Sequence, residues 1–154
     1  MNKALTILLL AFTISSFGQT SSTKKIEFLN LYTIDLTQVI ETKDGISDTY
    51  FYLWLRNQEY SAIVDSRMLR ISTKKEMELL LSDLTSAYTK MKVKGGESFR
   101  YKRDKYTIKT SYKYITIYVE DSIGISGYTN VGDYWMTKEL SKLIEAVKEA
   151  VKVL

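Results

Sequence analysis

Apolar residues recur at helical spacing in two stretches of the chain. The first stretch predicts a helix from Ser72 to Lys92, which begins with the capping-box pair Thr73 and Glu76 and ends before Gly95. The second predicts a helix from Thr137 to Leu154. The two apolar stripes are Met77, Leu80, Leu81, Leu84, Tyr88 and Met91, and Leu140, Leu143, Ile144, Val147, Val151 and Leu154.

Runs of aromatic and β-branched residues predict strands before and after the first helix. These runs cover residues 26–41, which could hold one long strand or two short ones, and 50–56, 60–65 and 67–72 before the helix. After it they cover residues 98–103, 105–112, 113–120 and 122–128. The turn signal Asp44-Gly45 separates the first two runs. We therefore expect an α+β fold of two antiparallel β-sheet-plus-helix units, each with about four strands and one helix, the helices packed on the sheets.

The two halves of the chain share this order of elements, which points to an internal duplication. Five apolar positions of the first helix match five of the second at a constant offset of 63 residues, from Met77 and Leu140 to Tyr88 and Val151. Amphipathic helices share such spacing by default, so duplication and a coincidence of periodicity both stay open.

A doubled order of four antiparallel strands and a helix resembles the Whirly-type fold, which binds single-stranded DNA. The resemblance is one of topology, covers most of the chain after residue 18 and rests on no sequence motif. The basic Lys-Gly-Lys-Ala-Ala-Leu motif of plant Whirly proteins has its nearest counterpart here in Lys94-Gly95-Gly96. The resemblance therefore implies a fold and carries over no functional residue.

The first 18 residues have the three-part layout of a secretory signal peptide. Lys3 provides a basic start, an apolar run follows from Ala4 to Ile14, and the small residues Ser16 and Gly18 mark a cleavage site. The run is shorter than the roughly 20 residues that span a bilayer, so we expect no integral membrane segment after cleavage. No Cys follows the run, which excludes a lipid anchor of the bacterial type. We expect an exported protein of the Gram-negative type, periplasmic or secreted.

Composition narrows the chemistry of the exported chain. Residues 19–25 are polar and are expected to be flexible, and residues 26–154 are expected to form a single α+β domain. The chain contains neither Cys nor His. It therefore lacks disulfides, Ser-His-Asp and Cys-His catalysis, haem attachment and the usual zinc or copper sites. We expect neither a cofactor nor a metal ion.

Cations are concentrated between Lys90 and Lys113. This segment contains nine Lys and Arg residues, and its only acidic residues are Glu97 and Asp104. The local net charge is +7 in a chain whose total is +4, so the charge is polarised. Such a field attracts anionic polymers and anionic surfaces. The candidate polyanion-binding residues are Arg100, Lys102, Lys105 and Lys109.

The same basic tract also fits a half-solvated β-hairpin. A two-residue turn at 103–104 would pair Tyr101 with Tyr106 on a buried face and leave the cations in water. This register places Lys102 opposite Lys105, and a like-charge pair is destabilising, so a longer loop that separates the lysines stays open. If the aromatic side chains are buried, only the charge indicates a function.

The strand from Tyr50 to Arg56 is apolar on both faces. A strand of this kind is either central in a sheet or meets a partner with its second face. The residues of that second face are Tyr50, Tyr52 and Trp54. They are candidates for an aromatic platform that binds a sugar or a peptide, beside the alternative that they fill the core.

Motifs that suggest an enzyme are incomplete. Ser72 and Lys75 fit the S-x-x-K pattern of penicillin-recognising serine enzymes, but the S-D-N motif is missing and a helix cap explains the same residues. Residues 124–127 fall short of a nucleophile elbow. Asp121 has no partner carboxylate at an identifying spacing. We expect no enzyme and keep a small carboxylate-based periplasmic hydrolase as the second alternative.

These patterns together predict a small exported, non-enzymatic binding or interaction protein of unknown ligand. The first alternative is a polyanion or membrane-surface binder that uses the basic β-hairpin. The partner would be another exported protein or an anionic polymer or surface. Nucleic acid is not expected, because an exported protein rarely meets a chromosome.

Overall fold

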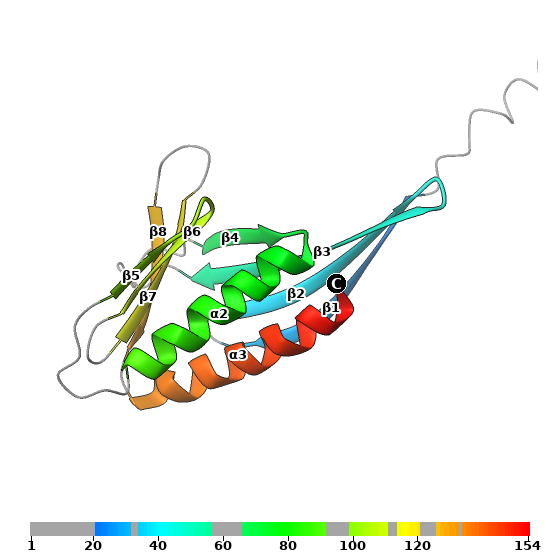
Figure 1. The fold of residues 1–154 in the computed structure, drawn as a ribbon. Helices are drawn as coiled ribbons and strands as arrows, with labels where there is room; N and C mark the ends of the chain where they lie inside the picture. Colours follow the sequence, from blue (N-terminus) through cyan, green and yellow to red (C-terminus); the bar gives the residue numbers. More distant parts are fainter. Residues whose placement is uncertain are drawn as a thin grey trace, which may run out of the picture.

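The computed structural model describes residues 21–31, 34–56, 66–91, 99–110, 114–120, 126–132 and 134–154. These residues form two antiparallel four-stranded sheets and two helices (Figure 1), which confirms the expected α+β class. Sheet A contains β1 (Ser21–Asn30), β2 (Ile34–Lys43), β3 (Ile46–Arg56) and β4 (Ser66–Ile71) in this order. Sheet B contains β5 (Phe99–Lys102), β6 (Tyr106–Thr110), β7 (Tyr114–Glu120) and β8 (Ser126–Gly132), again in sequence order.

Helix α2 (Lys74–Met91) lies between the two sheets in the sequence, and helix α3 (Tyr134–Val153) follows sheet B. Helix α3 therefore begins three residues before the predicted Thr137. The predicted signal peptide, residues 1–18, and the strand predicted at 60–65 lie outside the described residues.

The turn between β2 and β3 is the Asp44-Gly45 pair that the sequence predicts. Both residues have positive φ angles, 53° and 79°, as a two-residue type I′ turn requires. The tip of this hairpin and the start of β1 project beyond the ends of both helices (Figure 1). Ile46 at the tip is 77% exposed.

Strand β1 begins inside residues 19–25, the segment that we expected to be flexible. From Ser21 opposite Lys43 onward, the strand pairs with β2 although its first side chains are exposed. The side chains of this polar segment are not buried, so backbone hydrogen bonds to β2 keep it in the sheet. The register shifts between Glu27 and Leu29, which marks a β-bulge.

One hydrophobic cluster joins the inner faces of both sheets to the stripes of both helices. Helix α3 packs on β1 and β2, helix α2 packs on β6 and β7, and the two helices lie side by side. The buried stripe residues are Met77, Leu80, Leu84, Leu140, Leu143, Ile144 and Val147. The helical periodicity of the sequence thus identified the core-facing side of each helix.

Candidate functional site

Strand β3 divides its side chains between two faces, as the sequence predicts. The strand is flanked by β2 and β4, so it is central in sheet A. Its core face consists of Phe51, Leu53 and Leu55, which are buried. Its outer face, turned away from the core, carries Tyr50, Tyr52 and Trp54.

The outer face of sheet A exposes two large apolar side chains next to each other. Trp54 is 39% exposed, and Met68, directly opposite on β4, is 41% exposed. Tyr52 is half-buried, and Tyr50 is buried. Neighbouring rings meet edge to face, with centroids 5.1 Å apart for Tyr50 and Tyr52 and 6.3 Å apart for Tyr52 and Trp54. The row therefore presents a Trp–Met surface beside Tyr52 rather than a flat platform of three rings.

Tyr50, at the other end of this row, is held and covered by polar partners. Its hydroxyl donates to Glu41 Oε1 at 2.6 Å, and the Arg70 guanidinium lies 3.9 Å from its ring centroid. Arg70 Nη2 also lies 3.5 Å from Asp48 Oδ2. The hydrogen bond to Glu41 and burial raise the pKa of Tyr50 above its usual 10.0. Tyr50 is thus covered by polar side chains, and Trp54 is the most exposed ring of the row.

Asp35 on β2 lies directly opposite Trp54. Cross-strand partners on one face lie close together, so the carboxylate borders the indole. Its Oδ1 atom is buried and has no hydrogen-bond partner within the described part of the chain. An unsatisfied buried acceptor costs about 1–3 kcal/mol.

The basic hairpin adopts a register two residues away from the one that the sequence favours. Lys102 lies opposite Thr107 rather than opposite Lys105. The Arg103 N–H donates to the Tyr106 carbonyl at 2.8 Å, so the pairing extends to these two residues and the turn lies at Asp104 and Lys105, one residue later than the sequence favours. This correction has a simple physical reason, since the shifted turn takes Lys105 out of the strand pairing and so removes a like-charge pair with Lys102.

Three of the four candidate polyanion contacts lie on one exposed face of sheet B. Arg100 lies directly opposite Lys109, and Lys102 lies two positions along β5 on the same face. Lys109 Nζ lies 4.5 Å from the ring centroid of Tyr118 on the neighbouring strand β7. The structure therefore brings Arg100 and Lys109 together and leaves Lys105 elsewhere.

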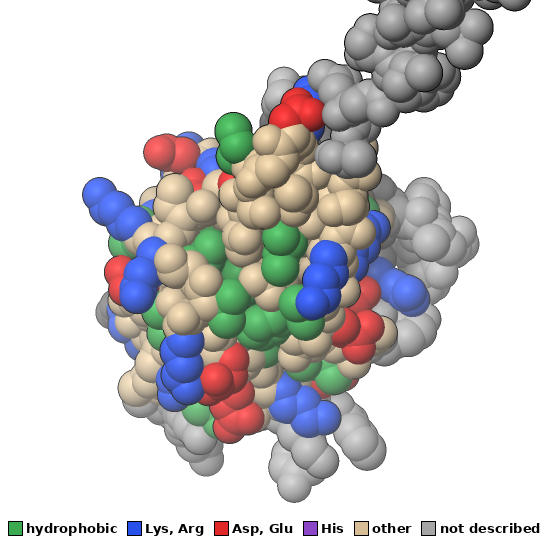
Figure 2. Space-filling view, turned by 90° about the vertical axis from the view of Figure 1, so that its right-hand side faces the viewer, with side chains coloured by type: hydrophobic (Ala, Val, Ile, Leu, Met, Phe, Trp, Pro, Cys, Tyr) green, Lys and Arg blue, Asp and Glu red, His purple; other side chains and the backbone are tan. Residues whose placement is uncertain are grey.

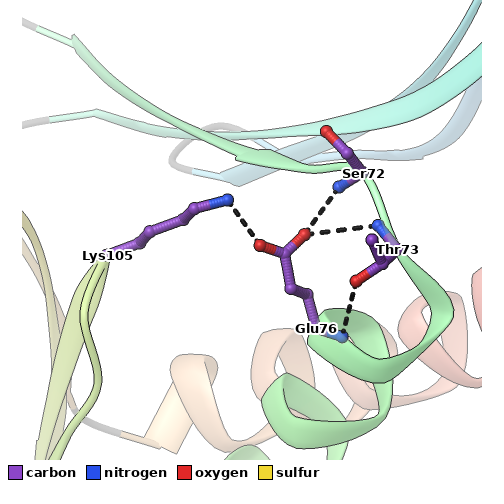
Figure 3. A network of polar contacts seen from close by, with 4 residues as sticks. All are labelled: Ser72, Thr73, Glu76 and Lys105. Carbon is purple, nitrogen blue, oxygen red and sulfur yellow. Dashed lines mark hydrogen bonds and ion pairs between the residues drawn. The ribbon is translucent and has the colours of Figure 1, made fainter.

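Lys105 is engaged at the N-terminus of helix α2 (Figure 3). Its Nζ atom donates to Glu76 Oε1, while Glu76 Oε2 accepts the N–H groups of Ser72 at 2.9 Å and Thr73 at 3.2 Å. Thr73 Oγ1 in turn accepts the Glu76 N–H at 3.2 Å, which confirms the predicted capping box. Burial alone would raise the pKa of Glu76, but Lys105 and the two backbone donors lower it below its usual 4.5.

An ion pair between the buried Asp83 and the half-exposed Arg103, which sequence reasoning missed, ties the β5–β6 turn to helix α2. Asp83 is buried, and its two carboxylate oxygens accept Arg103 Nε at 2.8 Å and Nη2 at 2.7 Å. The Tyr106 hydroxyl donates to the same carboxylate at 2.9 Å. Burial and the Asp83 charge raise the pKa of Tyr106 above its usual 10.0. The available signal was the position of Asp83 among the apolar residues between Leu80 and Ala87, where a carboxylate needs a partner.

No family model matches the chain, and no curated protein or solved structure is significantly similar to it. Function therefore rests on the geometry of this chain. Among the described residues, no three or more metal-ligating side chains gather into a site, and no helix is long and apolar enough to cross a membrane. Of the positions considered for catalysis, Asp121 and Gly124 lie outside the described residues. Ser72 lies in the helix cap, where its backbone N–H serves Glu76.

Proposed function

We propose that this chain is an exported, non-enzymatic binding protein and that the outer face of sheet A is its ligand surface. The observation that carries the proposal is the adjacency of Trp54 and Met68, which are 39% and 41% exposed. Single exposed apolar residues are ordinary on protein surfaces. An exposed aromatic ring beside a thioether, on a face that also carries charged side chains, is typical of interaction sites.

The chemistry of this face favours a saccharide ring as the ligand. The indole of Trp54 offers a flat apolar surface to the C–H groups of a sugar, and Asp35 beside it offers an acceptor to a sugar hydroxyl. A combination of aromatic surface and a few fixed polar groups is the usual composition of small-molecule sites. An extended peptide fits this place less well, because β3 is paired on both sides and has no free edge.

The non-enzymatic part of the proposal is supported by the structural roles of three carboxylates. Asp83 holds Arg103, Glu76 caps helix α2, and Glu41 accepts the Tyr50 hydroxyl. The export part is supported by the signal-peptide layout of residues 1–18. Expression in a Gram-negative host, followed by separation of periplasm and cytoplasm, tests export directly.

We also propose that the two sheet-and-helix units arose by an internal duplication. Both sheets have their strands in sequence order, and a helix follows each sheet. The apolar stripes of the two helices recur at the offset of 63 residues noted above. These features support a common origin of the two units and assign no function to either.

Saccharide binding is testable through the fluorescence of Trp54. The chain has two tryptophans, so Trp135→Phe leaves Trp54 as the only reporter. We expect a blue shift of the emission during titration with at least one of cellohexaose, laminarihexaose and chitohexaose. Trp54→Ala should abolish the binding heat measured by calorimetry while the circular dichroism spectrum is retained.

The matched control is Leu79→Ala, which truncates a side chain of equal exposure, 39%, on helix α2. Equal binding heats for Trp54→Ala and Leu79→Ala would refute the proposal, and so would the absence of binding to all three hexasaccharides. A shift that extended peptides produce and sugars do not would assign the face to a protein partner instead.

The alternative is a polyanion or membrane-surface binder, and one observation favours it. Arg100 and Lys109 form a like-charge pair across β5 and β6, and a bound anion would relieve their repulsion. The test is the salt concentration that elutes the protein from a heparin column. Arg100→Glu should elute at a clearly lower salt concentration than Lys74→Glu, an equal charge change at an exposed position of α2. Equal elution of the two variants would exclude a localised site.

A further inference from the structure

A groove of about 450 Å³ lies between strand β1 and helix α3. Phe28 and Leu29 line it from β1, and Ala146 lines it from α3. Its remaining lining residues are the charged Lys142, Glu145, Lys148 and Glu149 of the same helix. Figure 2 views the molecule from the side on which α3 ends and the hairpin projects, and apolar side chains gather there in the middle, bordered by charges of both signs. The groove thus has an apolar floor and a polar rim.

One wall of this groove is a free sheet edge. Strand β1 is the first strand of sheet A and pairs only with β2 among the described strands. Among the described residues, the backbone N–H and C=O groups on its other side therefore have no strand partner and can pair with a further strand. Helix α3 contacts both β1 and β2, so it runs along the sheet next to this edge.

The β-bulge in β1 turns two consecutive side chains toward the helix. In a regular strand Phe28 and Leu29 would point to opposite faces. The register shift between Glu27 and Leu29 changes this, and both Phe28 and Leu29 pack against the core cluster. Phe28 meets Phe51 edge to face with ring centroids 5.1 Å apart. Bulges that aim side chains in this way are common beside binding sites.

We propose that this groove is a second binding site, which takes an extended peptide segment of a partner protein as an additional strand of sheet A. The peptide backbone pairs with the free edge of β1, and every second side chain enters the groove between Phe28, Leu29 and Ala146. An edge strand beside a helix recognises extended peptides in this manner, with backbone hydrogen bonds for affinity and side-chain contacts for specificity. This site is separate from the saccharide surface, which lies on the opposite face of sheet A.

The lining predicts the composition of the peptide. The rim carries two Lys and two Glu residues, so its net charge is zero and it accepts both acidic and basic peptides. The apolar floor is formed by Phe28, Leu29 and Ala146, so it favours apolar side chains at the peptide positions that enter the groove. The expected ligand is therefore a segment with Val, Leu or Ile at alternate positions and polar residues between them.

Selection from a library of random dodecapeptides displayed on phage tests the proposal. We expect the enriched peptides to carry aliphatic residues at alternate positions. Ala146→Phe fills the groove and should weaken these peptides at least tenfold in a fluorescence-polarisation titration. The matched control is Leu79→Phe, which adds the same ring at the exposed face of α2 and should bind as the unaltered protein does. If Ala146→Phe fails to fold, Lys142→Trp at the exposed rim replaces it.

Amide hydrogen exchange measured by NMR locates the contact independently. Peptide binding should slow exchange at alternate residues of β1, those whose N–H groups point away from β2. Enrichment of no peptide family, equal affinity for Ala146→Phe, or protection confined to other strands would each overturn the proposal. A stable dimer with β1 already protected before peptide is added would overturn it too, since a second copy would then occupy the edge. Titration of Ala146→Phe with the hexasaccharides distinguishes this test from that of the Trp54 surface, because filling the groove should leave saccharide binding unchanged.

Discussion

Replacing Arg103 with alanine tests how firmly the β5–β6 turn is tied to helix α2. The guanidinium makes two hydrogen bonds to Asp83, 2.8 Å and 2.7 Å long. The Asp83 side chain is 3% exposed, whereas that of Arg103 is 43% exposed. The substitution therefore leaves a buried carboxylate that keeps a hydrogen bond from the Tyr106 hydroxyl.

The expected loss of stability follows from this unequal burial. Removing one partner of a fully buried ion pair costs about 3–5 kcal/mol, because the other charge stays buried without compensation. Water reaches the exposed side of Arg103, and the Tyr106 hydroxyl continues to serve Asp83, so we expect a smaller loss of about 2–3 kcal/mol. With a urea dependence of about 2 kcal/mol per molar for a domain of this size, the unfolding midpoint should fall by roughly 1 M.

The assay is urea denaturation followed by circular dichroism, with Lys102→Ala as the matched control. Lys102 is an exposed cation next to Arg103, and its removal should change the free energy of unfolding by less than about 0.5 kcal/mol. Equal midpoints for the two variants would refute the reasoning. The double variant Asp83→Leu with Arg103→Met should regain much of the lost stability, since an apolar pair leaves no buried charge.

Four further predictions concern the turn, the cap and pH. Gly45→Ala should destabilise the protein by about 1 kcal/mol in urea denaturation, because φ is +79° at this position. An added Cβ meets nothing within 4 Å, so backbone strain is the only expected cause, and an unchanged midpoint would rule it out. Thr73→Ala should cost about 1 kcal/mol by loss of the helix cap, against no change for exposed Thr85→Ala. The pKa of Glu76 is lowered, so its stabilisation is present above the usual 4.5 and is lost as pH falls through the folded-state value; Glu76→Gln should flatten the acid side of the stability–pH curve, and an unchanged curve would contradict this. The pKa of Tyr106 is raised, so its contribution is full below pH 10 and is lost as pH rises further; Tyr106→Phe should weaken the alkaline loss of stability, which a steeper loss would disprove.

The parts of the fold that the sequence predicted depend on local interactions. The capping pair Thr73 and Glu76 acts within one helical turn, and Asp44-Gly45 adopts its left-handed angles within one hairpin. The helix stripes follow from periodicity alone. Where the sequence pattern was weak, the observed boundary differs from the predicted one, as at the N-terminus of α3, which begins at Tyr134.

The parts that the sequence did not predict depend on contacts between distant segments. The hairpin register hinges on Arg103, whose partner Asp83 lies twenty residues earlier on another element. A turn at 103–104 satisfies local pairing, but the observed turn at 104–105 accompanies the contact of Arg103 with that carboxylate. The same limit applies to the candidate site. Alternation along β3 placed Trp54 on the outer face, whereas the burial of Tyr50 under Arg70 required knowledge of the neighbouring strand.

In the basic tract, contacts within the fold change what the concentration of cations indicates about function. Its charge suggested a surface free to hold a polyanion, yet several of its cations have partners within the fold. Arg103 is bound by Asp83, Lys105 is bound by Glu76, and Lys109 lies on a tyrosine ring. A polyanion that used Lys105 would have to displace Glu76 and so weaken the helix cap. Any polyanion affinity should therefore depend on Arg100 and Lys109 and be nearly insensitive to Lys105→Gln, whose main effect should be on the acid stability that Glu76 provides.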